Sequence, residues 1–291
     1  MNNKRRLFST LLCVAALTAG LFVSGCGSDK AGGIGSVVSS VVDGGSDEKA
    51  AAKLNTLIDA TNRFNGDNAT WGQNYADSLA KLKGGFQEGA IGRQPHYDTL
   101  KEALEQSKKE GSTFKEVDTE RDNVLNVLNE LVPTFKDLKA YDDSKAYMND
   151  GGAKGKELAA KYVAQVEKFD AAYAKFNDAL NKANTEQTKK QIEKLKKDGK
   201  KGYAAAMEST LRLTTLVENV EKAPKNADKQ AVEKELNEIQ TLLKSINNDR
   251  GEVLVNSYNS VVGSVRQVLT DANENNLNDM IENFNNYIES Y

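Results

Sequence analysis

The sequence predicts an all-α fold, an elongated multi-helix bundle built from long, amphipathic, antiparallel helices. Only three prolines occur among the 291 residues, and Lys, Glu, Ala, Leu and Asn dominate after residue 46, so little in this region breaks a helix. Apolar side chains recur there at steps of three and four, which places them on one stripe of a helix. No alternation typical of β-strands competes with these stripes. The hydrophobic content of 39% and the charged content of 28% are typical of a folded protein.

The first 25 residues have the features of a secretory signal peptide. Three basic residues at positions 4–6 precede Leu7–Phe22, an apolar stretch of sixteen residues that is short for a membrane span. Small residues at positions 24–25 then lie directly before Cys26, an arrangement that resembles the lipobox of bacterial lipoproteins. The alternative is an ordinary signal peptide, or an uncleaved anchor, with a chance cysteine.

Cys26 is therefore the predicted lipidation site, carrying an S-diacylglycerol group and an N-acyl chain such as palmitate after cleavage. Each buried methylene contributes about 0.8 kcal/mol, so two or three acyl chains hold a protein on a membrane essentially permanently. Gly27 follows the cysteine, where aspartate would resemble an inner-membrane retention signal. We expect an exported protein anchored to the cell envelope. Its place is the outer membrane in a cell with two membranes, and otherwise the outer face of the cell membrane.

Composition divides the remaining chain into a tether and a folded part. Residues 26–46 comprise the lipidated cysteine and a flexible segment rich in Gly, Ser and Val, whose twenty residues have a span of about 25 Å. Its paired valines leave open local packing or a short strand. Residues 47–291 are predicted to form one all-helical domain. Without the leader the net charge falls from −3 to about −6, which gives no electrostatic reason to bind nucleic acid.

The N-terminal half of the domain is predicted to contain two helices, a loop and a long heptad helix. Asp47–Phe64 has a one-sided apolar pattern, which Asn65-Gly66-Asp67 is expected to end. Asn68 would cap a second helix, and Gly84–Gln94, with four glycines, is predicted to be a loop. The core positions of these helices are Leu54, Leu57, Ile58, Phe64, Trp71, Tyr75, Leu79 and Leu82.

From Ser112 the heptad pattern is sustained, with Arg121 in one core position and Pro133 expected to kink the helix. Asn149–Gly152 is predicted to be a turn. An aromatic heptad run follows it, at Leu158, Tyr162, Val166, Phe169, Tyr173, Phe176 and Leu180.

The C-terminal half is predicted to contain a Lys-rich helix and three further amphipathic helices. Gly199 and Gly202 weaken the helix Thr185–Lys201, while Ala223–Asn226 separates two helices and Asp228 is the expected N-cap of the second. The predicted apolar stripes are Val232, Leu236, Ile239, Leu243 and Ile246, then Leu254, Tyr258, Val261, Val265 and Leu269, then Leu277, Ile281, Phe284 and Ile288.

The sequence offers little for catalysis. His96 is the single histidine, and its place beside a proline favours a helix start over a general base. One histidine and no free thiol exclude Cys–His catalysis and multi-histidine metal sites. Neither a Gly-x-Ser-x-Gly elbow nor a Gly-x-x-x-x-Gly-Lys-Ser/Thr phosphate loop occurs. We therefore expect no enzyme, no catalytic residue and no cofactor.

Two polar segments allow a second interpretation. Asp271, Asn273, Asn275 and Glu282 have the spacing of EF-hand ligands, but asparagine replaces the usual glycine at position 276, so a helix-capping turn without metal is favoured. Lys182–Lys201 contains eight lysines that could touch anionic lipid headgroups or an anionic polymer. Interspersed acidic residues favour a solvated helix face there.

A resemblance to the YiiG-like family of bacterial lipoproteins covers about Lys53–Tyr291. It is carried by Tyr141-x5-Tyr147-x-Asn149-Asp150-x3-Lys154-Gly155-Lys156-x-Leu158 and by the segments 54–65 and 284–291. Asn149 stands where the family is expected to have aspartate, and Ala159 where histidine is common. The resemblance implies an all-helical, membrane-anchored domain of uncharacterised function, without a substrate or catalytic residues.

The same segment forms the candidate cluster of the sequence, a turn that feeds a helix. We expect ion pairs to clamp the turn, a close backbone approach at Gly155, and, as the sharper alternative, a ligand site. The cluster comprises Tyr141, Asp142, Asp143, Tyr147, Asn149, Asp150, Lys154 and Lys156.

The predicted function is that of a non-enzymatic envelope lipoprotein, bound to membrane lipid through Cys26, whose helices bind an envelope protein or polymer. The alternative is a small-ligand or cation-binding module near Tyr141–Lys156. An exposed apolar patch would favour a protein partner, and a deep pocket lined by Tyr141, Tyr147 and Asp150 would favour a ligand.

Overall fold

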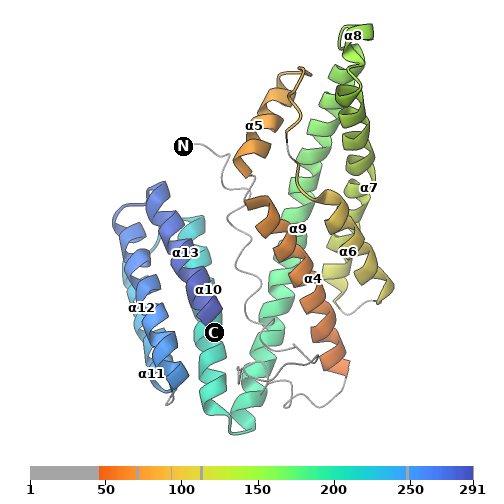
Figure 1. Ribbon diagram of the computed structural model, residues 1–291. Coiled ribbons are helices and arrows are strands. Elements are labelled where there is room, and N and C mark those ends of the chain that lie inside the picture. Colours follow the sequence, from red (N-terminus) through yellow and green to blue (C-terminus); the bar gives the residue numbers. More distant parts are fainter. Residues whose placement is uncertain (1–45, 70–71, 93, 112–113, 247–248, 291) are drawn as a thin grey trace. The chain divides into compact units, whose positions relative to one another are not determined.

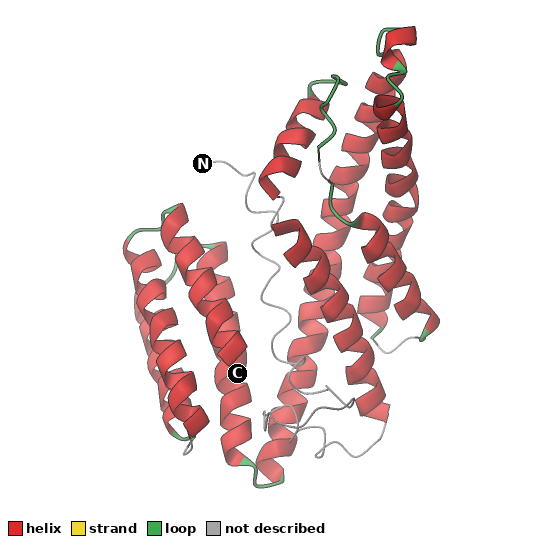
Figure 2. Ribbon diagram, viewed as in Figure 1, coloured by secondary structure: helices red, strands yellow, loops and turns green. Residues whose placement is uncertain are grey.

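A computed structural model of the chain describes residues 46–69, 72–92, 94–111, 114–246 and 249–290. Every regular element within these ranges is a helix, which confirms the all-α prediction (Figures 1 and 2). The leader, Cys26, Trp71 and the tether up to residue 45 lie outside the described residues.

The helices follow one another along the described ranges. They are α4 (Ser46–Ala69), α5 (Gly72–Lys83), α6 (Tyr97–Lys109), α7 (Lys115–Asp143), α8 (Tyr147–Asp150), α9 (Ala153–Lys197), α10 (Lys201–Lys222), α11 (Lys229–Lys244), α12 (Asp249–Thr270) and α13 (Glu274–Ser290).

Contacts between residues divide the chain into two compact units. Lys53–Ala183 forms unit 1, and Asn184–Tyr291 forms most of unit 2. Helix α9 is continuous through the boundary, because its 45 residues include no break. The single domain predicted for residues 47–291 stays a prediction.

Unit 1 is built from α4 to α8 and the first part of α9, around leucine and aromatic side chains. The predicted stripes supply its core, since Leu54 and Ile58 of α4 are fully buried together with Leu128 of α7 and Phe176 of α9. Aromatic rings join α4, α6 and α9, with Phe64 lying 5.4 Å from Tyr173 and 5.9 Å from Phe169, measured between ring centroids. Burial of these rings provides much of the driving force for folding this unit.

In unit 2, helices α10 to α13 lie side by side (Figure 1). Leu236, Ile239 and Leu243 of α11 are buried, as their spacing predicts. The predicted cap of α11 is confirmed, since Asp228 Oδ1 accepts hydrogen bonds from the backbone N–H groups of Gln230 (3.0 Å) and Ala231 (3.2 Å).

Two charged pairs fasten α11 to its neighbours in unit 2. The Arg212 guanidinium donates to Glu235 at 2.7 Å from both Nε and Nη2, and it also reaches Glu238. Arg266 binds Glu233 in the same two-pronged way, at 2.8 and 2.7 Å. Such forked pairs fix the relative orientation of the helices that carry them.

The predicted end of the first helix is wrong. Helix α4 runs through Asn65-Gly66-Asp67 to Ala69. Asn65 is 1% exposed and its Oδ1 accepts a hydrogen bond from the Tyr173 hydroxyl at 3.1 Å, so its side chain binds a partner on α9 instead of turning the local backbone. A long-range contact here overrides the local turn preference of asparagine.

Three other features of the helices differ from the sequence-based prediction or refine it. The predicted aromatic helix and the predicted Lys-rich helix form one helix, α9. It ends at Lys197, and Gly199 just beyond it has a left-handed conformation with φ +75°. Helix α7 continues through Pro133. In α13 the fully buried positions are Met280, Phe284 and Tyr287, so its stripe is centred one position away from Ile281.

Candidate functional site

The corner between α7 and α9 brings part of the predicted cluster together around Asp150. The Tyr141 hydroxyl donates to Asp150 Oδ1 at 2.5 Å. Backbone N–H groups of Gly152 and Lys154 donate to the same carboxylate at 2.9 and 3.0 Å. Asp150 thus satisfies free donors at the start of α9, as an N-terminal cap does. The hydrogen bond from Tyr141, followed by those from the backbone, holds the pKa of Asp150 below its usual value.

The expected close approach occurs at Gly155, in the first turn of α9. A Cβ atom built on Gly155 would lie 2.6 Å from ring atoms of both Phe86 and Tyr141. The two rings meet edge to face, with centroids 5.2 Å apart. Only a residue without a side chain lets these rings pack directly on the backbone of α9.

Phe86 belongs to the glycine-rich loop after α5, and this loop is fastened to the same corner. Its ring lies 5.8 Å from that of Tyr147, whose hydroxyl hydrogen-bonds to the Glu88 carboxylate. This bond, followed by burial, raises the pKa of Tyr147 to about 12. Further along the loop, Ser78 of α5 donates to the carbonyl of Ala90 at 2.7 Å. These contacts hold the loop against the corner between α7 and α9.

The prediction that ion pairs between members of the cluster hold the turn is wrong, because the charged side chains pair with other residues. Asp143 pairs with Lys139 of its own helix at 2.8 Å, and Lys154 pairs with Glu157 at 3.1 Å. Each partner lies one turn away on the same helix, so the charged groups pair without reaching across the corner. Asp142 is half-buried, whereas Asn149 and Lys156 are exposed.

The sequence did not single out a group of three buried tyrosines in unit 1. The hydroxyls of Tyr75 and Tyr97 lie 2.9 Å apart, and Tyr162 donates to the side-chain carbonyl of Gln94. Burial raises the pKa of each tyrosine, so the hydroxyls stay protonated. Because the three residues come from α5, α6 and α9, no local spacing pattern reveals the group.

The Asp170 carboxyl interacts electrostatically with all three tyrosines of this group. Burial raises the pKa of Asp170 to about 6, an effect that Lys83 opposes and Glu167 reinforces. Lys83 also binds Glu167 directly at 2.8 Å. Asp170 is therefore a carboxyl of unit 1 whose pKa lies above its usual range.

His96 has the role that its sequence context favours. It is the N-cap residue of α6, its side chain is exposed, and that side chain forms no capping hydrogen bond. Its carbonyl accepts the N–H of Leu100 at 3.1 Å, which begins the helix.

Comparison with family models matches residues 48–289 to the family described as "Protein of unknown function (DUF3829)". The chain belongs to the DUF3829 family. The match spans helices of both units, from α4 to α13. No curated protein and no solved structure matches the chain significantly.

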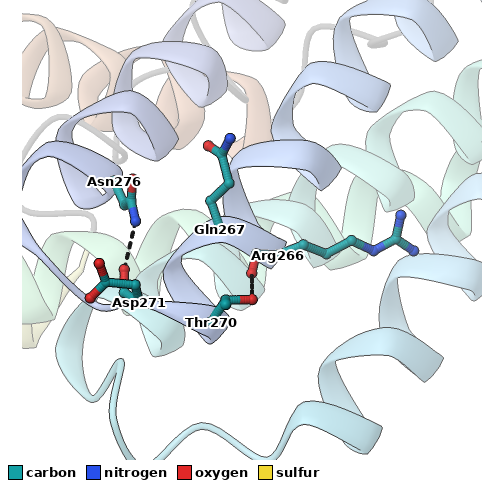
Figure 3. Close-up of a pocket in the computed structure, with 5 residues that line it drawn as sticks. All are labelled: Arg266, Gln267, Thr270, Asp271 and Asn276. Carbon is teal, nitrogen blue, oxygen red and sulfur yellow. Dashed lines mark hydrogen bonds between the residues drawn. The ribbon is translucent and has the colours of Figure 1, made fainter.

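In the DUF3829 chain, the segment with EF-hand spacing is a helix-capping turn. Asn273 Oδ1 accepts the backbone N–H of Asn276 at 2.9 Å. The side-chain amide of Asn276 donates to the Asp271 carbonyl at 2.7 Å (Figure 3). Helix α13 already begins at Glu274, so Asn275 and Glu282 lie in a helix instead of a binding loop. The hydrogen bonds of Asn273 and Asn276 are those of a helix-capping turn, and the absence of a metal there stays a prediction.

A surface hollow lies beside this turn in unit 2, lined by Arg266, Gln267, Thr270, Asp271 and Asn276. Figure 3 shows the Arg266 side chain extending away from Asp271 and Asn276. Because the guanidinium is held by Glu233, the hollow does not gather convergent charged groups.

Two kinds of feature are absent from the described ranges. They contain no group of three or more His, Cys, Asp or Glu side chains placed to hold a metal ion. No described helix combines the length and the apolar character that crossing a membrane requires.

Proposed function

We propose that this DUF3829 protein is an exported lipoprotein, anchored through lipid on Cys26, whose helices bind another component of the cell envelope without catalysing a reaction. The observation that carries the proposal is the apolar leader that ends in small residues directly before Cys26. The resemblance of the Tyr141–Leu158 segment to YiiG-like lipoproteins supports it.

The groups of the corner support a structural role there. Asp150 is engaged by Tyr141 and by two backbone N–H groups, and Phe86 covers Gly155. These contacts occupy the side chains that a small ligand or cation would need. No observation favours the ligand-binding alternative near Tyr141–Lys156.

The described surface favours a partner that binds through polar contacts. Among the described residues, the large hydrophobic side chains that are clearly exposed are Met148 and Val253, with exposed fractions of 72% and 50%. Met148 belongs to α8 in unit 1 and Val253 to α12 in unit 2, so the described part of each unit presents one such side chain. An envelope protein or polymer recognised by charged and amide groups fits this surface better than an apolar docking partner.

Crosslinking in intact cells tests the proposed role. The protein is tagged at its native locus and crosslinked, and captured partners are identified by mass spectrometry. We expect an envelope component to be enriched with the natural protein and lost with Cys26→Ser, because that variant stays uncut and lacks the lipid. Recovery of the protein only as itself at native abundance would contradict the binding role. Unchanged processing and membrane retention of Cys26→Ser would contradict the anchor.

A further inference from the structure

A dense positive charge lies where α9 turns into α10. Residues 189–201 contain seven lysines and two acidic residues, a net charge of +5, while the rest of the chain after the leader carries −11. We call this segment the lysine turn. Its lysines are Lys189, Lys190, Lys194, Lys196, Lys197, Lys200 and Lys201.

The structure places these lysines on the solvent side of the turn. Ile192 and Leu195 of the same segment are buried, with exposed fractions of 4% and 2%, whereas the lysines are exposed except for the half-buried Lys200. Lys196 is paired, to Glu208 at 2.9 Å and to Glu193 at 3.4 Å. Over the described ranges the other six ammonium groups form no ion pair, so most of this charge is not neutralised by the protein.

Helix stability explains only part of the charge. Lys194 and Lys197 lie in the last turn of α9, where a cation interacts favourably with the helix dipole. Lys200 and Lys201 stand instead at the beginning of α10, where the dipole disfavours a positive charge, and Lys200 forms no side-chain cap. The fold alone therefore gives no reason for lysines on this side of the turn.

Two contacts within unit 1 involve α4, which follows the tether in the sequence, and α9, which leads to the lysine turn. The Lys53 ammonium near the start of α4 binds the carbonyls of Glu110 and Gly111, at the end of α6. A few residues further on, Glu116 at the start of α7 binds Lys182 of α9 at 2.7 Å. In the sequence the tether leads directly into α4, and beyond Lys182 helix α9 continues for about 22 Å to its end in the lysine turn.

We propose that the lysine turn binds the anionic phospholipid headgroups of the membrane that holds the Cys26 lipid. This inference rests on the proposed function, because the tether keeps the turn at a high local concentration of lipid surface. Each lysine near an anionic bilayer is attracted to it, and salt screens the attraction. Since the apolar side chains of the turn are buried, the contact is electrostatic and does not insert into the acyl region.

Lysine reactivity in the lipidated full-length protein tests the proposal. The purified protein is reconstituted in vesicles of phosphatidylcholine, with or without phosphatidylglycerol, and treated with an uncharged amine-acylating reagent before mass spectrometry. We expect Lys189, Lys190, Lys197 and Lys201 to react at least about threefold more slowly in the anionic vesicles at low salt, and equally in both at high salt. Equal rates at low salt would overturn the proposal. Protection by added soluble polyphosphate but not by anionic lipid would also overturn it, in favour of a polymer.

Exposed lysines of unit 1 supply the control. Lys161, Lys168 and Lys175 lie on the same helix, are exposed and form no ion pair among the described residues. We expect their reaction rates to be the same in both vesicle types. Equal protection of these lysines would mean that the whole surface approaches the bilayer, and would overturn the assignment to the turn.

The mass of the N-terminal peptide separates the two possible failures. An acylated Cys26 without protection of the lysine turn refutes this inference and leaves the anchor standing. If Cys26 is unmodified, the same protein is added to preformed vesicles, and we then expect Lys189→Gln, Lys190→Gln, Lys197→Gln and Lys201→Gln together to lower binding to anionic vesicles about tenfold. Replacing Lys161, Lys168, Lys175 and Lys225 by glutamine removes the same charge and should leave binding unchanged. An equal loss in both variants would refute the inference.

Discussion

At Gly155, the absence of a side chain allows two aromatic rings to pack on a helix backbone. The sequence suggested a close approach there, because glycine is costly in a helix and is retained when something must lie near it. It did not show that Phe86, almost seventy residues earlier, makes the approach. Pairings over such distances in the chain depend on the packing of whole helices, which no local spacing encodes.

Replacing Gly155 by alanine should destabilise unit 1. The new Cβ would stand 2.6 Å from Phe86 and Tyr141, so a ring must move, at a cost of about 1–3 kcal/mol in the free energy of unfolding. Urea unfolding followed by circular dichroism measures the change. Gly202→Ala is the matched control, since nothing lies within 4 Å of the position that its new methyl group would take and alanine favours the helix. Equal stability of Gly155→Ala and the natural protein would contradict the packing at the corner.

Asp170 should make the stability of unit 1 depend on pH. Its pKa is raised from the ordinary 3.8 to about 6, so the folded state binds this proton more tightly than the unfolded state does. The stabilisation is present below the ordinary pKa and is lost as pH rises through about 6, which amounts to at most about 3 kcal/mol. Asp170→Asn should therefore raise stability more at about pH 7.5 than at about pH 5.

The measurement for Asp170 is the difference in urea midpoint between variant and natural protein at the two pH values. Asp178→Asn, on the exposed face of the same helix, controls for a general effect of removing charge. A difference for Asp170→Asn that does not change with pH would show that burial does not raise the pKa of Asp170.

The sequence predicts a helix and its bounds correctly where the apolar stripe and the signals at the helix ends agree. Helix α11 has both, since Leu236, Ile239 and Leu243 are buried and Asp228 caps its start. Helix α4 was predicted too short because the turn signal at Asn65 conflicts with its long-range bond to Tyr173. A polar side chain in a helix interior indicates a turn only when it lacks a partner elsewhere in the fold.

Removing the cap of α11 should destabilise unit 2. In Asp228→Ala the N–H groups of Gln230 and Ala231 lose their acceptor, which should lower the free energy of unfolding by about 0.5–2 kcal/mol. Thermal unfolding followed by circular dichroism measures this loss. Asp228→Ser keeps a side-chain acceptor and should remain close to the natural protein. A loss as large in Asp228→Ser as in Asp228→Ala would show that the cap bond is not the cause.

For the whole molecule, the described residues form two helical units, and the family match covers helices of both. The candidate cluster could be located from sequence because its turn and its Lys-Gly-Lys segment are local features. Its contacts could not, since Tyr141 binds Asp150 across the corner while Lys154 pairs with Glu157 of its own helix. The proposed biological role rests on the leader and Cys26, because a lipidation signal is itself a short sequence pattern.

Mass spectrometry of the N-terminal peptide from the natural, membrane-extracted protein tests the central claim most directly. We expect a peptide that begins at Cys26 and carries a diacylglyceryl group on its sulfur, with a further acyl chain on its amino group where the cell adds one. A peptide that retains the leader, or a Cys26 terminus without lipid, would contradict the account.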